Sequence, residues 1–353
     1  MPANGQVRIR FFSDTHLGFD YPIKPRIDRR RRGKDFFDNF YRILNGSADS
    51  NIDLLVHGGD LFFRNRVHPK IIDLVYGALF EFADRGVPIV IVPGNHERSK
   101  LPESLYLSHP NIHVFARPMT FPFRIRDTQV AVSGFPFERD NIKGRFRNRL
   151  DQTGWQEAGG DIRLLCLHQA VEGARVGPVN YTFRSGLDVI RFQDLPDGFQ
   201  AILAGHVHRQ QVLTDRRRSS RAARRVIYAG STERTSFAEK DEDKGFFDIT
   251  FNPNGADQWE IGSFGFKRLP VRPMADIIID RNLDSRELES FLSARISQLD
   301  QDSIVRIKGN GKPVDTDIKQ KLTVEFLKRM FPATMNVELS SDVRPARRRP
   351  AGG

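Results

Sequence analysis

Five apolar runs of strand length in this chain each end at one or two aspartate, asparagine or histidine residues. The clearest is Leu54–His57, which stops at Gly58 and Gly59 and then presents Asp60. An apolar run bounded by glycines is typical of a buried strand, and the glycines permit a tight turn at its end. Because Gly-Asp is also an ordinary turn signal, this stretch is informative only together with the other strand ends.

The side chains at the five strand ends all offer an oxygen or an imidazole nitrogen as a possible metal ligand. Singly, each is equally well explained as a turn former or as a satisfied core residue. Five such groups, each at the same end of a strand, would be an improbable coincidence, so we favour a metal site over the structural interpretation. The groups are Asp14 and His16, Asp60, Asn95 with His96, His168, and His206 with His208.

Ligands of this kind, without thiolate, suit manganese, iron or zinc better than calcium or a structural zinc. With His96 set aside, the remaining seven exceed what one ion can use. The sequence therefore predicts two divalent ions that share one carboxylate, with Asp60 as the bridge. A two-residue spacing would turn both side chains of a pair to the same side of an extended segment, in Asp14-x-His16 and in His206-x-His208.

The composition is that of a soluble globular protein with a basic excess. Lys and Arg number 55 against 44 Asp and Glu, which gives a net charge of +11. Such an excess suits a polyanionic partner or simply aids solubility, and net charge alone does not choose between nucleic acid and a membrane surface. The single cysteine, Cys166, lies in an apolar run, so we expect core packing and no disulfide. With no signal-peptide segment and no run of about 20 apolar residues, we expect a cytoplasmic protein without a membrane partner.

The periodicity of apolar residues predicts an α/β fold. Strands alternate with helices over the first part of the chain, where we expect strands at 7–12, 54–56 and 88–92 and helices from 35 and over 69–85. In such sheets ligands bind at the carboxyl ends of the strands. Shorter strands follow, which we interpret as a second sheet, at 112–115, 121–126, 129–134, 162–167, 200–203, 226–229 and 246–251.

A change of composition after Pro270 predicts a domain boundary. The remainder has the pattern of a small α+β unit, and from residue 341 the chain is Arg-rich and expected to be disordered. The sequence therefore divides into 1–270, 271–340 and 341–353. Within the second part we expect strands at 276–279, 303–307 and 334–339 and helices at 284–299 and 315–330.

The ligand motifs together resemble the calcineurin-like metallophosphoesterase superfamily, over residues 1–270. Within it, the segments 14–18 and 59–62, and especially 228–239 continuing to 244–246, are similar to the SbcD-type nucleases of DNA double-strand-break repair. The resemblance implies a four-layer αββα sandwich of two mixed sheets, with a small C-terminal α+β capping domain. The motifs are Asp14-x-His16, Gly59-Asp60, Gly94-Asn95-His96-Glu97, His168 and Gly205-His206-x-His208.

The resemblance also implies a role for each ligand. One ion would be held by Asp14, His16, Asp60 and His208, and the other by Asp60, Asn95, His168 and His206. His96 would stabilise the transition state or protonate the leaving oxygen. Two ions, manganese in this family, would bind a phosphate diester, lower the pKa of a bridging water and neutralise the transition state.

One position departs from the nuclease pattern. The family commonly has a histidine three residues after the bridging aspartate, where this chain has Phe63. That histidine helps to position the scissile phosphate, so its replacement bears on processive exonuclease activity and leaves the metal site intact. His68 in the next loop could substitute for it, although an exposed loop residue is the simpler interpretation. We expect His57, His109 and His113 to be structural or surface residues.

Basic segments provide candidate contacts to a DNA backbone, because Lys and Arg supply most sequence-independent affinity for phosphate. A solvated surface loop is the alternative in each case. For the arginines of 216–225 and for the tail we weigh the two equally, because no aromatic residues interleave with them. The predicted contacts are Arg29, Arg30, Arg31, Arg32, Lys34, Lys143, Arg145, Arg147 and Arg149.

These observations lead to the hypothesis of a manganese-dependent DNA phosphodiesterase that acts as an exonuclease or endonuclease in DNA repair. One alternative is a phosphodiesterase for nucleotides or other small diesters, which the same metal site permits. Another is a DNA-end-binding subunit of an SMC-like coiled-coil ATPase complex. The expected partners are DNA, such an ATPase and a second copy of the chain.

Overall fold

The computed structural model describes residues 5–22, 30–46, 51–98, 100–102, 109–215, 224–255, 258–280, 282–311 and 313–344. The chain divides into two compact units. Residues 1–23 and 33–270 form the first, and residues 24–32 and 271–353 form the second. Arg30, Arg31 and Arg32, which come directly before residue 33, therefore group with the C-terminal part of the chain, which the division predicted from sequence did not anticipate.

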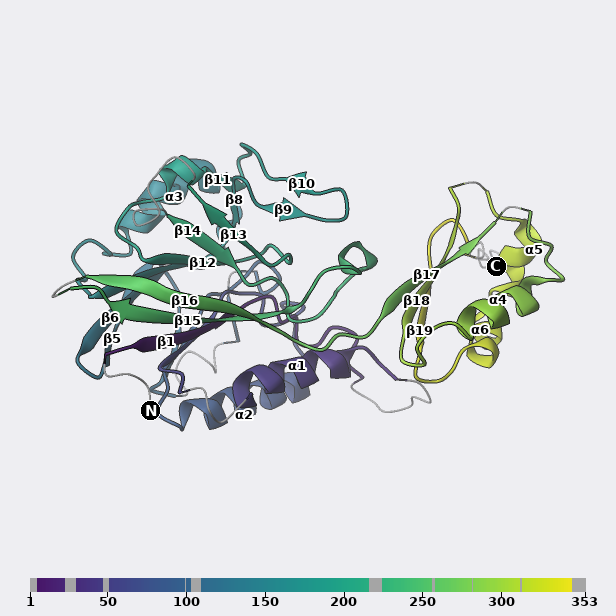
Figure 1. Ribbon diagram of the computed structural model, residues 1–353, viewed down its shortest axis with the longest axis horizontal. Helices are drawn as coiled ribbons and strands as arrows, with labels where there is room; N and C mark the ends of the chain where they lie inside the picture. The colour runs from purple at the N-terminus through teal and green to yellow at the C-terminus, as the bar shows by residue number, and fades with distance from the viewer. Residues whose placement is uncertain are drawn as a thin grey trace, which may run out of the picture. The chain divides into compact units, whose positions relative to one another are not determined.

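The first sheet of the larger unit has six strands in the order β16-β15-β1-β2-β3-β4 (Figure 1). Four of them are parallel: β1 (Val7–Phe12), β2 (Leu54–His57), β3 (Ile89–Ile91) and β4 (Ile112–Val114). The antiparallel pair β15 (Gly245–Pro253) and β16 (Trp259–Arg268) continues the sheet beyond β1. The strands predicted near 112 and 246 thus belong to the first sheet, and their assignment to a second sheet was wrong.

The second sheet also has six strands, in the order β13-β14-β12-β7-β6-β5. Its parallel centre consists of β6 (Thr128–Gly134), β7 (Ile162–His168), β12 (Ala201–Gly205) and β14 (Arg225–Tyr228). Antiparallel strands β5 (Met119–Ile125) and β13 (Gln211–Thr214) form its edges. Short pairs lie beside it: β8 (Ala170–Val171) with β11 (Val189–Ile190), and β9 (Arg175–Val176) with β10 (Tyr181–Thr182).

The two sheets and their helices form four layers (Figure 1). Helices α1 (Gly33–Asn45) and α2 (Pro69–Ala83) pack on the first sheet, and α3 (Ile142–Asp151) packs on the second. Strand β7 shows why its sequence is a continuous apolar run: Leu164 and Cys166 lie in the core between the sheets, whereas Leu165 and Leu167 face α3. The predicted αββα sandwich of two mixed sheets is confirmed.

Helix α3 contains residues 143–149, for which the prediction from sequence is a basic segment and no helix. Ile142, Phe146 and Leu150 recur every four residues and are buried on one face of this helix. This spacing is the usual signal of an amphipathic helix, and the intervening arginines masked it. No helix in the described ranges has both the length and the apolar character needed to cross a membrane.

The smaller unit has a parallel three-stranded sheet of β17 (Met274–Ile279), β18 (Ile304–Gly309) and β19 (Asn336–Leu339). Its helices are α4 (Leu288–Ile296), α5 (Thr316–Lys321) and α6 (Val324–Met330). The single helix predicted over 315–330 is thus two helices, because Thr323 begins α6 by accepting a hydrogen bond from the N–H of Phe326.

The start of the segment predicted to be a disordered tail packs into this unit. Val343 is fully buried in its apolar core, and Asp342 accepts a hydrogen bond from the N–H of Gly309 at 2.8 Å. Residues 345–353, the rest of that segment, lie outside the described residues.

An ion pair between the buried Arg10 and the partly exposed Asp248 joins β1 and β15, and Arg10 also contacts α1. The guanidinium of Arg10, whose side chain is 4% exposed, donates to both carboxylate oxygens of Asp248 at 2.8 and 3.1 Å and to the carbonyl of Ile43 at 2.8 Å. We expect Asp248→Ala to lower the free energy of unfolding by about 3 kcal/mol, because it removes the carboxylate from a buried cation. Urea denaturation measures this change.

The double variant Arg10→Met, Asp248→Leu provides the matched control. It removes both charges and fills their place with apolar atoms, so most of the lost stability should return. A single Asp248→Ala variant as stable as the wild type would show that the ion pair contributes little.

Candidate metal centre

The seven predicted ligands lie on loops that leave the carboxyl ends of the two sheets. Asp14 and His16 follow β1, Asp60 follows β2, and Asn95 follows β3. From the second sheet, His168 ends β7, and His206 and His208 follow β12. Both sheets are parallel at their centres, and the packing of one on the other therefore brings these ends together.

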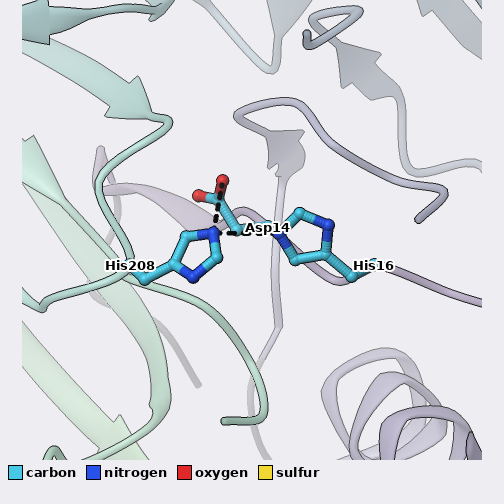
Figure 2. A group of neighbouring side chains, drawn as sticks. All are labelled: Asp14, His16 and His208. Carbon is cyan, nitrogen blue, oxygen red and sulfur yellow. Dashed lines mark hydrogen bonds and ion pairs between the residues drawn. The ribbon is translucent and has the colours of Figure 1, made fainter. Parts of the chain in front are cut away.

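A first group of ligand atoms comes from Asp14, His16 and His208, which point toward one another in Figure 2. The Nε2 atoms of His16 and His208 are 2.9 Å apart, and Asp14 Oδ1 is 3.8 Å from His208 Nε2. Asp60 Oδ2 lies 4.0 Å from His16 Nε2. Asp14, His16 and His208 thus converge within the dimensions of one ion site, and Asp60 lies beside His16.

A second group is formed by Asp60, Asn95, His168 and His206. The side-chain oxygen of Asn95 is 3.0 Å from His168 Nε2 and 2.9 Å from His206 Nδ1. Asp60 Oδ2 lies 3.4 Å from His168 Nε2. The same carboxylate oxygen therefore faces both groups, which is the arrangement that a bridging ligand requires.

Four of the seven predicted ligands have a left-handed backbone: φ is +52° at Asp14, +44° at His16, +54° at Asp60 and +83° at His206. Such conformations cost of order 1–3 kcal/mol each and persist where the surroundings enforce them, most often at functional sites. The extended backbone expected for Asp14-x-His16 and His206-x-His208 was therefore wrong. The side chains converge because the chain turns sharply at these ligands.

Backbone hydrogen bonds hold the first two loops in this strained form. The N–H groups of Asp14 and His16 donate to the carbonyls of Gly59 and Asp60 at 2.9 and 3.0 Å, which extends the pairing of β1 with β2 into the loops. Position 59 requires glycine, because φ is +106° there and a Cβ atom would lie 2.2 Å from Nδ1 of His168.

The donor set fits divalent metal ions, since it combines carboxylate, amide and imidazole ligands in two groups that share one oxygen. Residues 7–210 match the family described as calcineurin-like phosphoesterase. The chain belongs to this family. The match confirms the superfamily that the ligand motifs indicated.

Relatives of this phosphoesterase carry the name DNA double-strand break repair protein Mre11. The protein from Haloferax volcanii is 26% identical over 323 residues, which cover 90% of this chain and 65% of the relative. Those from Thermoplasma acidophilum and Sulfurisphaera tokodaii are 25% and 24% identical, over 63% and 59% of this chain. These matches confirm the resemblance to the DNA-repair nuclease branch. The chain spans 65%, 55% and 50% of the length of the three relatives.

Charges within the phosphoesterase site favour ionised Asp60. Burial alone would raise the pKa of its carboxyl group, but His168 and the other imidazoles around it hold that pKa well below the ordinary value. Burial would likewise lower the pKa of His168, yet the charge of Asp60 and the hydrogen bond between them raise it to about 9. The Nδ1–H of His168 donates to the carbonyl of Gly58 at 2.8 Å, which aims Nε2 at the ligand group.

His57, which we expected to be structural, lies directly beneath the phosphoesterase site. Its Nδ1 accepts a hydrogen bond from the N–H of Gly59 at 3.2 Å, so Nε2 carries the hydrogen and donates to the hydroxyl of Thr15 at 3.1 Å. The ring is neutral, because burial and the neighbouring His168 lower its pKa to about 3. His57 thus joins the loop that carries Asp14 and His16 to the loop that carries Asp60.

His96 occupies the solvent side of the site. Its Nδ1 donates to the carbonyl of Phe63 at 2.8 Å, and its Nε2 lies 3.9 Å from Asp60 Oδ2. The ring of Phe63 packs beside that of His96 at 5.6 Å and against Phe19 at 4.9 Å. His68 is not part of the site: its Nδ1 caps α2 by accepting from the N–H of Lys70 at 3.2 Å.

Several of the predicted DNA contacts have partners within the protein. Arg145 and Arg149 pair with Glu138 at 3.0 and 2.6 Å, Lys143 donates to Ser185, and Lys34 pairs with Asp38. Arg147 is exposed. In the smaller unit, Arg30 pairs with Asp302 at 2.9 Å, Arg31 is half-buried and Arg32 is buried, whereas Arg29 lies outside the described residues. Contact with DNA stays a prediction for this set.

Glu97 belongs to the motif Gly94-Asn95-His96-Glu97, and the sequence predicts no role for it. Its contacts in the structure give it a positioning role. Its buried carboxyl group accepts hydrogen bonds from the N–H groups of Phe62 and Gly94, both at 2.7 Å. It therefore joins the loop after β2, which carries Asp60, to the loop after β3, which carries Asn95. Burial, together with the charge of Asp60, raises its pKa to about 8.

We expect Glu97→Leu to lower the free energy of unfolding by about 2 kcal/mol, because two buried N–H groups lose their acceptor. Since the two ligand loops lose their common contact, affinity for divalent ions should also fall. Urea denaturation and calorimetric titration with Mn²⁺ measure the two effects. Glu81→Leu, at an exposed position on α2, is the control. Unchanged metal affinity in Glu97→Leu would show that the loops hold their positions without it.

Proposed function

We propose that this chain is a metal-dependent phosphodiesterase that cleaves DNA, a nuclease of the SbcD type that acts in double-strand-break repair. The observation that carries this proposal is the position of Asp60 Oδ2, 4.0 Å from His16 Nε2 and 3.4 Å from His168 Nε2, between two groups of ligand atoms. The proposed occupants are two divalent ions, which the oxygen and imidazole ligands suit, and Mn²⁺ is proposed on the resemblance to the SbcD-type branch.

When bound, such ions activate a water molecule and neutralise the charge of a phosphodiester. The protein's own contribution is to fix the seven ligands and to place His96 beside them. Because Nδ1 of His96 donates to the carbonyl of Phe63, the ring is held with Nε2 toward the site. An imidazolium in this position would stabilise negative charge on the phosphoryl group or give its Nε2 proton to the leaving oxygen.

DNA is the proposed substrate because the relatives are named as DNA double-strand break repair proteins and because the chain has a net charge of +11. An SMC-like coiled-coil ATPase and a second copy of the chain are the proposed protein partners, on the resemblance to the SbcD-type branch. The relatives are longer than this chain, so their further segments could contribute to either contact.

Cleavage of labelled duplex and single-stranded DNA in the presence of Mn²⁺ tests the proposal. We expect His96→Ala to reduce the cleavage rate about 100-fold to 10,000-fold, since it removes a general acid. Its affinity for Mn²⁺ should stay near that of the wild type. His109→Ala, which removes a histidine that pairs with Asp84 at 3.1 Å away from the ligand groups, is the matched control and should cleave normally.

Two other outcomes would contradict the nuclease proposal. Cleavage of bis(p-nitrophenyl) phosphate without cleavage of DNA would indicate a phosphodiesterase for small diesters. Salt-sensitive binding of DNA ends without metal-dependent cleavage would indicate a DNA-end-binding subunit.

The presence of phenylalanine at position 63 favours the small-diester alternative. Its ring lies beside His96, where the related nucleases commonly have a histidine that positions the scissile phosphate. If the chain is a nuclease, Phe63→His should increase exonuclease activity on duplex ends several-fold, because it adds a hydrogen-bond donor for the phosphate. Cleavage of the small diester should change less. A gel assay of end-labelled duplex measures the first and absorbance the second, and an equal change in both would contradict this role for position 63.

A further inference from the structure

Glu239 lies directly behind the predicted ligand His208. It belongs to a short 3-10 turn, Phe237–Glu239, in the segment 228–246 that is similar to the SbcD-type nucleases and otherwise has no assigned role. The Nδ1 atom of His208 is 3.2 Å from Glu239 Oε1, and its Nε2 atom faces His16 and Asp14. One end of the ring is thus bound to a carboxylate, and the other end faces the ligand group.

Four further groups hold the carboxylate of Glu239 in place. Its Oε1 accepts from the hydroxyl of Thr235 at 2.5 Å, and its Oε2 accepts from Lys244 Nζ at 2.6 Å and from the hydroxyl of Ser231 at 3.2 Å. The hydroxyl of Ser236 is 3.4 Å from Oε1. Glu239 and Lys244 are both buried. A carboxylate with this many fixed donors cannot rotate away from the histidine.

Lys244 closes the network on His208 itself. Its ammonium group donates to the backbone carbonyl of His208 at 3.0 Å as well as to Glu239. The ring of His208 is therefore fixed through Glu239, and its backbone is fixed through Lys244. A buried lysine and glutamate carry a large desolvation cost, so a segment with only a scaffolding role would be served as well by apolar residues.

We propose that Glu239 is a positioning residue that orients His208 for the ion held by Asp14, His16 and His208. The proposal rests on the metal centre described above. A carboxylate hydrogen-bonded to Nδ1–H fixes the tautomer in which Nε2 is the free ligand atom, and its charge makes that nitrogen a better ligand.

The same reasoning makes the two ion sites unequal. His168, in the second group, donates its Nδ1–H to the backbone carbonyl of Gly58, a neutral acceptor. Among the hydrogen bonds of the described residues, His208 is the only predicted histidine ligand whose Nδ1–H donates to a carboxylate, and it belongs to the first group. Removal of the charge of Glu239 should therefore weaken one ion and leave the other unchanged.

Calorimetric titration of the full chain with Mn²⁺ tests this inference. The wild type should bind two ions, and Glu239→Gln should bind one of them 10-fold to 100-fold more weakly, with the second unchanged. Glu239→Asp keeps the charge and should recover part of the loss. Glu242→Gln is the matched control, because Glu242 pairs with Lys244 at 3.1 Å in the same network but is not in contact with His208. It should leave both affinities unchanged.

The possible outcomes separate this inference from the proposed function. Equal weakening of both ions, or of neither, in Glu239→Gln would overturn the positioning role. A wild type that binds no Mn²⁺ would overturn the metal centre and, with it, the role of Glu239. If Glu239→Gln fails to fold, the double variant Glu239→Gln, Lys244→Met removes the unpaired ammonium, and the same loss of one ion is expected. The ¹⁵N chemical shifts of His208 provide a second readout, since a purely structural glutamate would leave its tautomer unchanged.

Discussion

The carboxylate of Asp60 is the group on which both halves of the candidate site depend. Its Oδ1 accepts a hydrogen bond from the N–H of His96 at 2.9 Å, and this bond fixes the orientation of Oδ2. Oδ2 then faces His16 on one side and His168 on the other. Burial penalises the charge of this carboxylate, and the imidazoles of His168, His16 and His96 offset that penalty, so Asp60 stays ionised and available as a ligand. The arrangement is understandable if cations occupy the space between these groups.

Packing of the core between the sheets offsets the conformational cost of the left-handed backbone at the candidate site. Residues of β1 and β2, such as Ile9, Phe11 and Val56, pack against Leu164 and Leu203 of the second sheet, and all five are fully buried. The strand ends from which the ligand loops begin are therefore held by packed side chains of both sheets. Left-handed backbone at four ligands would relax to a commoner conformation on a mobile loop, but here the loops are bonded to one another and to fixed strand ends.

Much of this arrangement could be predicted from the sequence, because it follows from local patterns. Apolar runs such as 54–56 and 162–167 indicated the strands, and the polar residues after them indicated the ligands. The position of β15 beside β1 could not be predicted, since antiparallel pairing over more than 200 residues leaves no local signal. For the same reason, the contact of Glu239 with His208 is visible only in three dimensions. Left-handed backbone at Asp14 or Asp60 also has no signature, because neither residue type requires it.

The candidate site has a buried part and a part that is exposed to solvent. The side chains of His16 and His168 are fully buried, and that of Asp60 is 2% exposed, whereas His96 is 35% and His208 26% exposed. Under the proposed function, a phosphodiester would therefore approach on the side of His96 and His208. Phe63 packs beside His96 on this side, and its carbonyl fixes the His96 ring. A substitution at position 63 would therefore change the surface beside His96 and leave the buried predicted ligands unchanged. Family membership thus bears on the buried metal-binding residues, whereas under the proposed function the residues around His96 would bear on which phosphodiester is cut.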